Sequence, residues 1–242
     1  MENKTRKYFK YVIGEILLIV TGILIALQIN NWNENRKNYN IEQSTLISLK
    51  SDLESALVQL NEKILQNKSY KERDSILLDV IHFKKDISED NFLRLTLDHI
   101  YSPGFSPESG TLNEILFTGK MEIIQNRNLR KHISNWNKFM DELKEVDQIL
   151  THFDLQVKTP LYSKQIPYRK RIIPFLNYNP KINYEFPKSN FEWNSKELLQ
   201  NKEFENMLSN YIIYSKFQYD RLLNIKENIN EMITLINQDI NK

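Results

Sequence analysis

Residues 11–29 read YVIGEILLIVTGILIALQI, and this stretch decides how the rest of the chain is organised. It contains a single formal charge, Glu15. At 1.5 Å per residue, a helix of this length spans about 28 Å, close to the thickness of a bilayer's hydrocarbon core. The stretch therefore predicts a transmembrane helix that anchors all the residues after it.

Two other interpretations of this stretch are weaker. A cleaved signal peptide has a shorter apolar core of about 7–15 residues and ends in a small-residue cleavage site, whereas this run ends in Gln28-Ile29-Asn30-Asn31. A buried core helix is rarely apolar on every face for so long. Trp32 on one side, with Tyr8 and Phe9 on the other, suits the two membrane–water interfaces.

The charges that flank the apolar stretch predict its orientation. Lys4, Arg6, Lys7 and Lys10 precede it, whereas only Arg36 and Lys37 follow it closely. Because positive charge is retained on the cytoplasmic side, we expect residues 1–10 in the cytoplasm, residues 11–30 in the membrane and residues 31–242 outside the cytoplasm. The chain has no Cys, so it leaves the redox compartment unmarked.

The run IGEILLIVTGILIALQINNWNENRK, residues 13–37, resembles the opening of a family of uncharacterised membrane proteins from Bacteroidetes, catalogued as domain of unknown function 6090. Residues 111–130, TLNEILFTGKMEIIQNRNLR, are similar to the family's central segment, although Phe117-Thr118 stand where small polar residues are usual. The resemblance covers nearly the whole chain. It implies a single-pass protein of the bacterial inner membrane with a periplasmic domain, and it implies no activity.

Composition predicts an all-α fold. The 242 residues include only 5 Gly, with Asn, Lys, Ile and Leu abundant, which favours helices over a turn-rich β fold. The first 15 residues hold four of the 33 basic and two of the 31 acidic residues, so the remainder is formally neutral. A neutral domain lacks a general electrostatic attraction for nucleic acid, and we expect no nucleic-acid partner.

Apolar residues recur at spacings of three and four in three long segments, which predict three long helices. The first continues from the membrane to about Phe83. The second runs from an Asn126 cap to Pro160, and the third runs from about Lys202, after Asn201, to Ile240. With the transmembrane segment, these helices predict an extracytoplasmic antiparallel helical bundle.

Shorter helices and one ambiguous stripe complete this prediction. Ser88 is placed to cap a helix that ends near Ile100, and Thr111-x-x-Glu114 looks like a capping box for a helix that stops near Gly119. The apolar stripe from Leu46 to Ile64 fits either one face of an ordinary bundle or a partner-binding coiled coil. The bundle is favoured because strict heptads are not sustained.

Residues 160–194 contain five of the seven prolines, with Tyr, Phe and Asn between them. They predict a long extended loop on the bundle, of a length that is often functional. Arg169, Lys170 and Arg171 within it form a candidate contact for an anion or for lipid headgroups. The alternative interpretation is a solvated charge run, which is the more common role of such clusters.

No motif predicts catalysis or cofactor binding. The four histidines stand apart in the sequence and, without Cys, make no metal-ligand spacing. Glycine-rich phosphate loops, nucleophile elbows and dinucleotide fingerprints are missing from the sequence. We therefore name no catalytic, cofactor-binding or metal-binding residue and expect no cofactor.

The membrane segment itself carries the sharpest functional pattern. At 100° per residue, Gly22 and Ala26 lie within about 20° of the direction of Glu15 on a helix. Ionisable residues in membrane helices are functional candidates, and small residues four apart let helices approach closely. We hypothesise that Glu15, Gly22 and Ala26 form a helix contact in a homodimer or with another membrane protein. Alternatively, Glu15 reaches the cytoplasmic headgroups and the small residues are incidental.

Two classes of function remain open. The first is a membrane-anchored binding, sensing or scaffolding module that acts through protein–protein contacts; its cytoplasmic tail is too short for an output domain of its own. The second is an envelope-associated enzyme whose site lies under residues 160–194. The sequence favours the first class because chemical motifs are lacking.

Replacing Gly22 with Ile tests the proposed membrane contact. A branched side chain on this stripe keeps neighbouring helices apart, so we expect Gly22→Ile to weaken self-association in a membrane reporter assay. An unchanged reporter signal would remove the hypothesis.

Overall fold

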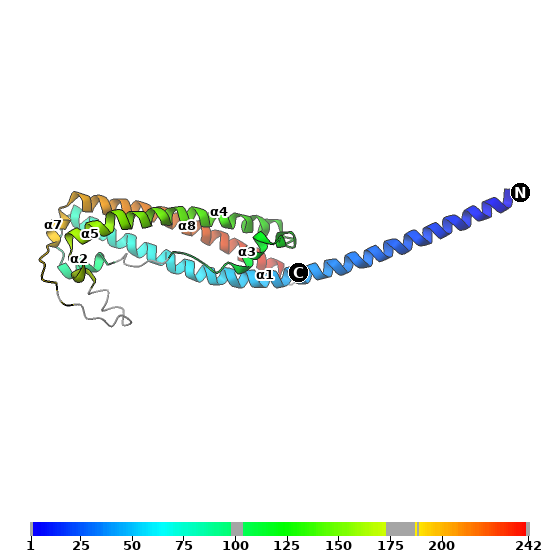
Figure 1. Ribbon diagram of the computed structural model, residues 1–242, viewed down its shortest axis with the longest axis horizontal. Coiled ribbons are helices and arrows are strands. Elements are labelled where there is room, and N and C mark those ends of the chain that lie inside the picture. The colour runs from blue at the N-terminus through cyan, green and yellow to red at the C-terminus, as the bar shows by residue number, and fades with distance from the viewer. Residues whose placement is uncertain (1, 98–103, 173–186, 188, 241–242) are drawn as a thin grey trace.

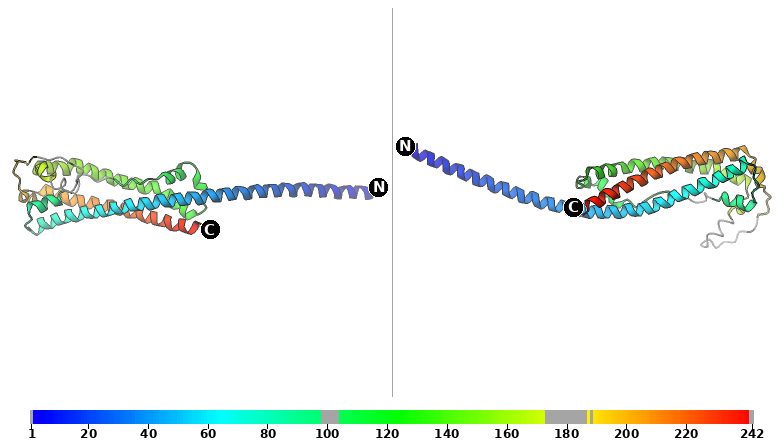
Figure 2. Two further views of the ribbon diagram at one scale, coloured as in Figure 1. Left: turned by 90° about the horizontal axis from the view of Figure 1, so that it is seen from below. Right: turned by 180° about the vertical axis from the view of Figure 1, so that it is seen from behind.

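The computed structural model describes residues 2–97, 104–172, 187 and 189–240, and these residues form an all-α structure. Three long helices make up its frame: α1 (Glu2–His82), α4 (Arg127–Phe153) and α8 (Lys202–Asp239). The three predicted long helices are thereby confirmed. The molecule is a rod-shaped bundle from which the first half of α1 projects (Figures 1 and 2).

Helix α8 is the central element of the bundle. It packs against both α1 and α4. It runs antiparallel to both of them, while α1 and α4 point the same way (Figure 1). The C-terminal end of α8 is tied to the start of the bundle, where Gln43 Nε2 donates to the carbonyl of Asp239 (3.1 Å) and Asn126 Nδ2 donates to Asp239 Oδ2 (2.6 Å).

Two apolar clusters fill the bundle. The first, nearer the projecting helix, joins the α1 stripe Leu46–Ile64 to α8 residues such as Ile225 and Ile229. The second lies at the far end and includes Leu77, Phe92 and Phe204. Because the stripe from Leu46 to Ile64 faces this core, its interpretation as one face of a bundle is confirmed.

Residues 104–109 form an extended segment that leads into α3 (Gly110–Phe117), with Phe105 buried in the first cluster. Figure 1 shows this segment lying along the bundle before α3. The short helix α2 (Glu89–Leu95) lies at the far end of the bundle (Figure 1).

Several predicted helix ends are confirmed. Asn126 Oδ1 accepts from the backbone N–H of Asn128 (3.0 Å), and Asn201 Oδ1 accepts from that of Glu203 (2.7 Å). Ser88 caps α2, although this helix ends at Leu95, earlier than predicted. The last three residues of the predicted helix, 98–100, lie outside the described residues.

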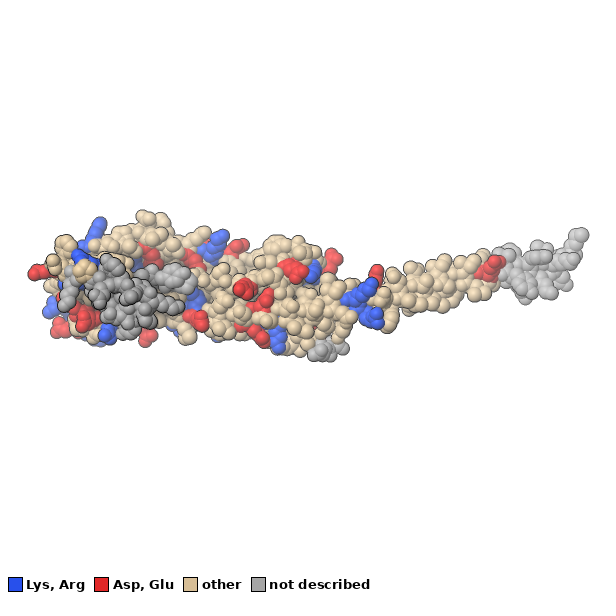
Figure 3. Space-filling model, turned by 60° about the horizontal axis from the view of Figure 1, so that its bottom comes forward, with Lys and Arg blue, Asp and Glu red and all other residues tan. Residues whose placement is uncertain are grey.

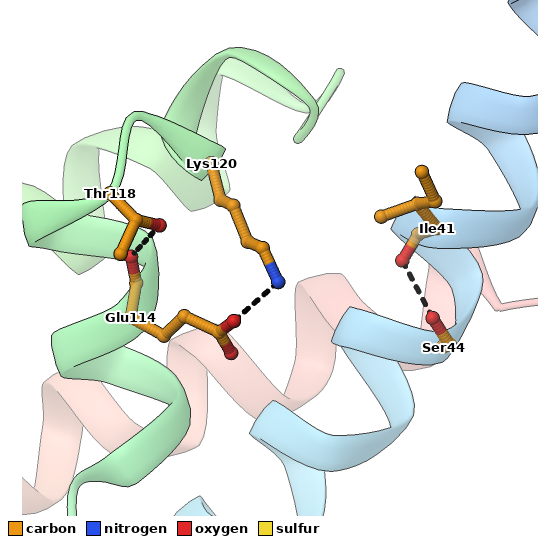
Figure 4. A network of polar contacts seen from close by, with 5 residues as sticks. All are labelled: Ile41, Ser44, Glu114, Thr118 and Lys120. Carbon is orange, nitrogen blue, oxygen red and sulfur yellow. Dashed lines mark hydrogen bonds and ion pairs between the residues drawn. The ribbon is translucent and has the colours of Figure 1, made fainter.

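The predicted capping box at Thr111 is wrong. Helix α3 begins at Gly110 with Ser109 as its N-cap, two residues earlier than predicted, and the Asp52 carboxylate of α1 accepts from the Thr111 N–H (3.0 Å). Glu114 instead pairs with Lys120 in the turn that follows (Figure 4). A carboxylate from another helix has therefore replaced the local cap. The predicted stop is confirmed, because Gly119 adopts a left-handed conformation with φ of 78°.

Pro160 does not end the second long helix, which corrects that prediction. A π-helical turn, η2 (Asp154–Lys158), follows α4 directly and leads into α5 (Thr159–Gln165), where Pro160 stands in the first turn. Proline is tolerated there because the first N–H groups of a helix lack intrahelical acceptors.

The predicted extended loop over residues 160–194 is likewise wrong at its start. Residues 160–165 belong to α5, and residues 168–172 are also helical. Residues 173–186 and 188 lie outside the described residues. The segment closes at Asn194, whose side chain caps the short helix α7 (Ser195–Leu199).

The interior position of Leu53 generates a stability test. Leu53 is fully buried, whereas Leu223 on α8 is 39% exposed. We expect Leu53→Ala to lower the free energy of unfolding by about 2–5 kcal/mol, because it leaves a cavity in the core. The matched change Leu223→Ala should cost far less, since surface changes usually stay within about 0.5 kcal/mol. Urea unfolding of the full chain in detergent, followed by circular dichroism, measures both; equal losses would contradict this packing.

Candidate functional site

A layer of polar side chains separates the two apolar clusters inside the bundle. We call it the polar layer. Its residues come from all three long helices and from η2, and several are almost fully buried, including Asn67 at 3% and Lys158 at 2% exposure. Its members are Lys63, Asn67, Tyr70, Asp74, Asp147, Asp154, Lys158, Tyr211, Ser215 and Gln218.

Hydrogen bonds within the polar layer join the three long helices. Gln218 Nε2 on α8 donates to Asp147 Oδ1 on α4 (2.6 Å). Asn67 Nδ2 on α1 donates to Gln218 Oε1 (2.8 Å) and to the carbonyl of Ser215 (3.0 Å). Buried polar contacts of this kind are satisfied in only one alignment of the helices. The layer therefore sets the register of α1 and α4 along α8.

A small cavity of about 100 Å³ lies in the polar layer, and residue Gly104 of the extended segment lines its outer side. Two buried acceptor atoms, Asn67 Oδ1 and Asp154 Oδ1, have no hydrogen-bond donor among the described residues. A water molecule occupies about 30 Å³ in the liquid. The cavity can therefore hold a few waters that donate to these oxygens.

Burial shifts the protonation equilibria of the pair formed by Asp147 and Lys63. Burial raises the pKa of the Asp147 carboxyl above its ordinary value, while the Gln218 hydrogen bond and the Lys63 charge oppose the shift. Burial lowers the pKa of the Lys63 ammonium, and the charge of Asp147 opposes that shift. Each charge thus offsets part of the effect of burial on the pKa of the other group.

A second group of charges surrounds η2. Burial raises the pKa of the Asp154 carboxyl, and the positive charges of Lys158 and Arg171 oppose the rise. Lys158 Nζ lies 4.0 Å from the centre of the Tyr211 ring. Burial and the nearby Asp154 raise the pKa of the Tyr211 phenol, so this hydroxyl stays protonated. The positive charges of Lys158 and Arg171 thus offset the negative charge of Asp154 in a poorly solvated interior.

The three residues of the predicted basic contact, 169–171, have different surroundings in the structure. Arg171 is 7% exposed, and its guanidinium donates to the carbonyl of Thr96 through Nε (3.1 Å) and Nη2 (2.7 Å) while stacking on Tyr162. Arg169 instead donates to the carbonyl of Pro187 from the surface (3.1 Å). Arg171 therefore ties α2 to the far end of the bundle, and Lys170 is left half-buried beside it. An anion or headgroup contact through Arg169 and Lys170 stays a prediction.

The predicted membrane contact lies on the projecting part of α1. Glu15, Gly22 and Ala26 are all exposed, and a Cβ added at Gly22 would meet no atom within 4 Å. No other segment among the described residues covers this helix, which is long and apolar enough to cross a membrane. The structure leaves the contact open to a partner outside the chain.

The described residues contain no group of His, Asp and Glu side chains that could hold a metal ion. His132 Nδ1 lies 2.8 Å from Asn228 Oδ1 of α8, and His152 lines two surface grooves on α4. The enzymatic alternative placed a site under residues 160–194, of which 173–186 and 188 lie outside the described residues. It stays a prediction.

Sequence reasoning missed the polar layer, although a signal for it exists. In α1 the apolar stripe reaches Ile64, and the next positions on the same face are Asn67 and Asp74. Likewise, Ser215 and Gln218 stand at core spacing between Tyr211 and Leu222 in α8. Polar residues at core positions of two facing helices predict a buried polar layer.

Comparison with known proteins places the chain in a family. The model of a family of unknown function, DUF6090, matches residues 15–156, more than half of the chain, and the chain belongs to that family. The match covers α1 from Glu15 onward, α2, α3 and α4, and so includes Asp147 and Asp154. No curated protein and no solved structure matches the chain.

The raised pKa of Asp147 predicts a pH effect on stability. The folded protein binds the proton of this carboxyl more tightly than the unfolded chain does, whose pKa is near 3.8. The free energy of unfolding therefore falls as pH rises from that value through the raised pKa. Asp147→Asn keeps an acceptor for Gln218 and removes this fall, whereas Asp141→Asn, on the exposed side of α4, should retain it. Unfolding curves from pH 4 to pH 7 compare the three proteins; identical slopes would contradict the assignment.

Proposed function

We propose that this member of the DUF6090 family is a single-pass inner-membrane protein whose periplasmic bundle binds or scaffolds other proteins. In this proposal residues 1–10 lie in the cytoplasm, residues 11–30 cross the membrane and residues 31–242 lie in the periplasm. The excess of basic residues before the apolar stretch supports this orientation. The resemblance of residues 13–37 to membrane proteins of Bacteroidetes supports the bacterial envelope as its location.

The continuity of α1 is the observation that carries the proposal. The apolar segment and the first helix of the bundle are one helix, Glu2–His82. The large apolar side chains between Ile16 and Ile29 are 45–77% exposed. Exposed apolar surface of this extent needs a lipid or protein environment. The helix therefore links a membrane segment to a folded domain without a flexible joint.

The stretch of α1 between the membrane segment and the bundle, residues 30–41, acts as a neck. It is helical and mostly exposed, and packing of the bundle begins at Glu42, whose carboxylate accepts from the Gln125 N–H (2.7 Å). Twelve residues of helix extend about 18 Å. Arg36 stacks on Trp32 at the membrane side of this neck, and Figure 3 shows basic groups at the same place. The neck thus holds the bundle at a set height above the bilayer.

The outer surface of the bundle offers larger spaces than its interior does. The interior cavity of about 100 Å³ is well below the 300 Å³ or more that is usual for small-molecule sites. Two grooves on the outer side of α4, of about 570 and 510 Å³, are lined by apolar side chains that include Met140, Leu155 and Val157. Apolar grooves on a helical rod fit side chains from a protein partner.

Because the chain lacks Cys, single introduced cysteines test the proposed topology cleanly. We expect Asn210→Cys, exposed on α8, to react with a membrane-impermeant maleimide in spheroplasts. Thr5→Cys, in the short N-terminal segment, should react only after the membrane is permeabilised. Labelling of Thr5→Cys in intact spheroplasts, with Asn210→Cys protected, would refute the orientation.

A further inference from the structure

A second set of apolar residues follows the outward face of α1. Ile47, Val58, Leu65, Ile76 and Phe83 are spaced by 11, 7, 11 and 7 residues. At 100° per residue, the four that belong to α1 fall within about 20° of one line along the helix, and Phe83 directly follows its last residue. We call this set the outer line. It lies apart from the core stripe that begins at Leu46, so α1 has two apolar faces.

The outer line is open to solvent along the whole bundle. Its side chains are 42–66% exposed, and the most exposed is Leu65. Scattered apolar residues are normal on a protein surface, but those from Ile47 to Ile76 share one face over about 44 Å of helix, counted at 1.5 Å per residue. Figure 3, which brings the α1 side of the bundle forward, shows wide uncharged areas between isolated charged groups. The alignment indicates a surface for a long helical partner.

The same face of α1 continues into the membrane. Counting back from Ile47 at 100° per residue, Ile29 falls on the outer line and Gly22 lies within about 20° of it. Gly22 has no neighbour within 4 Å of an added Cβ, and Ile29 is 61% exposed. A partner that packs against Gly22 in the bilayer therefore meets the outer line as it leaves the membrane.

We propose that the partner on the outer line is a second copy of this chain, packed in parallel through α1. The inference rests on the proposed membrane anchoring, because two copies inserted in the same direction are parallel and stand at the same height. Identical apolar residues then meet each other across a two-fold axis. One 11-residue and one 7-residue spacing together make 18 residues, or five full turns, so every second residue of the line returns to the same angle. Two straight helices can follow such a line without supercoiling.

The charges beside the outer line are compatible with this arrangement. Glu54 and Glu72 lie close to the line, and each is preceded by a lysine four residues earlier, Lys50 and Lys68. Lys50 Nζ lies 3.7 Å from Glu54 Oε1. The opposite flank carries Glu62 and Arg73, so both flanks are of mixed sign. The lysines offset the glutamates nearest the line, so the charges leave a parallel pair possible without favouring it.

Anchoring in a membrane lowers the contact area that the outer line must provide for a dimer. Stable soluble dimers usually bury about 1,200–2,000 Å² in total, more than a narrow line of five side chains provides. Two anchored copies diffuse in one plane with a fixed orientation, which raises their effective concentration. A narrow apolar contact that is too weak in solution therefore suffices in the bilayer.

Cysteine cross-linking in native membranes tests the pairing. Two differently tagged copies, each with Val58→Cys, Leu65→Cys or Ile76→Cys, are co-expressed and oxidised. We expect a disulfide-linked dimer that carries both tags, formed several-fold faster than with Gln59→Cys or Lys71→Cys. These controls are exposed on the same helix, about 100° and 120° away from the outer line. Equal rates at line and control positions, or dimers at none of them, would overturn the proposal.

A second variant separates the surface from the fold. Adding Val58→Glu and Leu65→Glu to Ile76→Cys places charge in the line, so the dimer should be lost while the helix content stays unchanged. A dimer that persists in this variant would contradict the pairing. The impermeant-maleimide labelling distinguishes the two proposals. The expected topology without cross-linking would refute only the pairing of two copies. Reversed topology would refute the periplasmic location, and the cross-linking result would then be judged separately.

Discussion

Burial of one face of α1 against α8 is the interaction on which the rest of the structure depends. Leu46, Leu53 and Leu60 are fully buried in the cluster that also contains Ile225 and Ile229 of α8. Helix α4 packs on the other side of α8, and the extended segment with Phe105 closes the groove. Because α1 also contains the apolar segment that is long enough to cross a membrane, this packing joins that segment to the bundle. An isolated helix of twelve residues is marginal in water, but the neck is continued by stable helix at both ends.

The polar layer gives the bundle a defined alignment that apolar packing alone does not supply. Leucine and isoleucine stripes tolerate sliding by a turn, whereas the contacts of Asn67 with Ser215 and Gln218 are made in one register. Desolvation of Asp147 and Lys63 is the energetic cost of that alignment. The layer lies between the two apolar clusters.

The repeated spacing of apolar residues predicted the three long helices of this fold. Contacts between distant parts of the chain decided the local details that the sequence did not reveal. The stripes of α1, α4 and α8 and the asparagine caps depend on residues that are close in sequence, so local reasoning finds them. The Thr111 capping box failed because Asp52, from a distant part of the chain, satisfies that N–H. Pro160 failed as a helix end because a π turn places it where no N–H is needed. Arg171 was expected on the surface, but the carbonyl of Thr96 draws it inside.

The central claim is that one unbroken helix carries the membrane segment into the bundle. The distance between spin labels at Asn31→Cys and Gln59→Cys tests it most directly. It is measured by pulsed electron–electron double resonance in bilayers, with the labelled protein diluted by unlabelled protein. Both positions lie in α1 and are exposed. The 28 residues between them correspond to about 42 Å of continuous helix. If α1 is one continuous helix, the two labels give one narrow distance distribution near that value. A broad distribution with a shorter mean would show that the neck bends or unfolds and would contradict the claim.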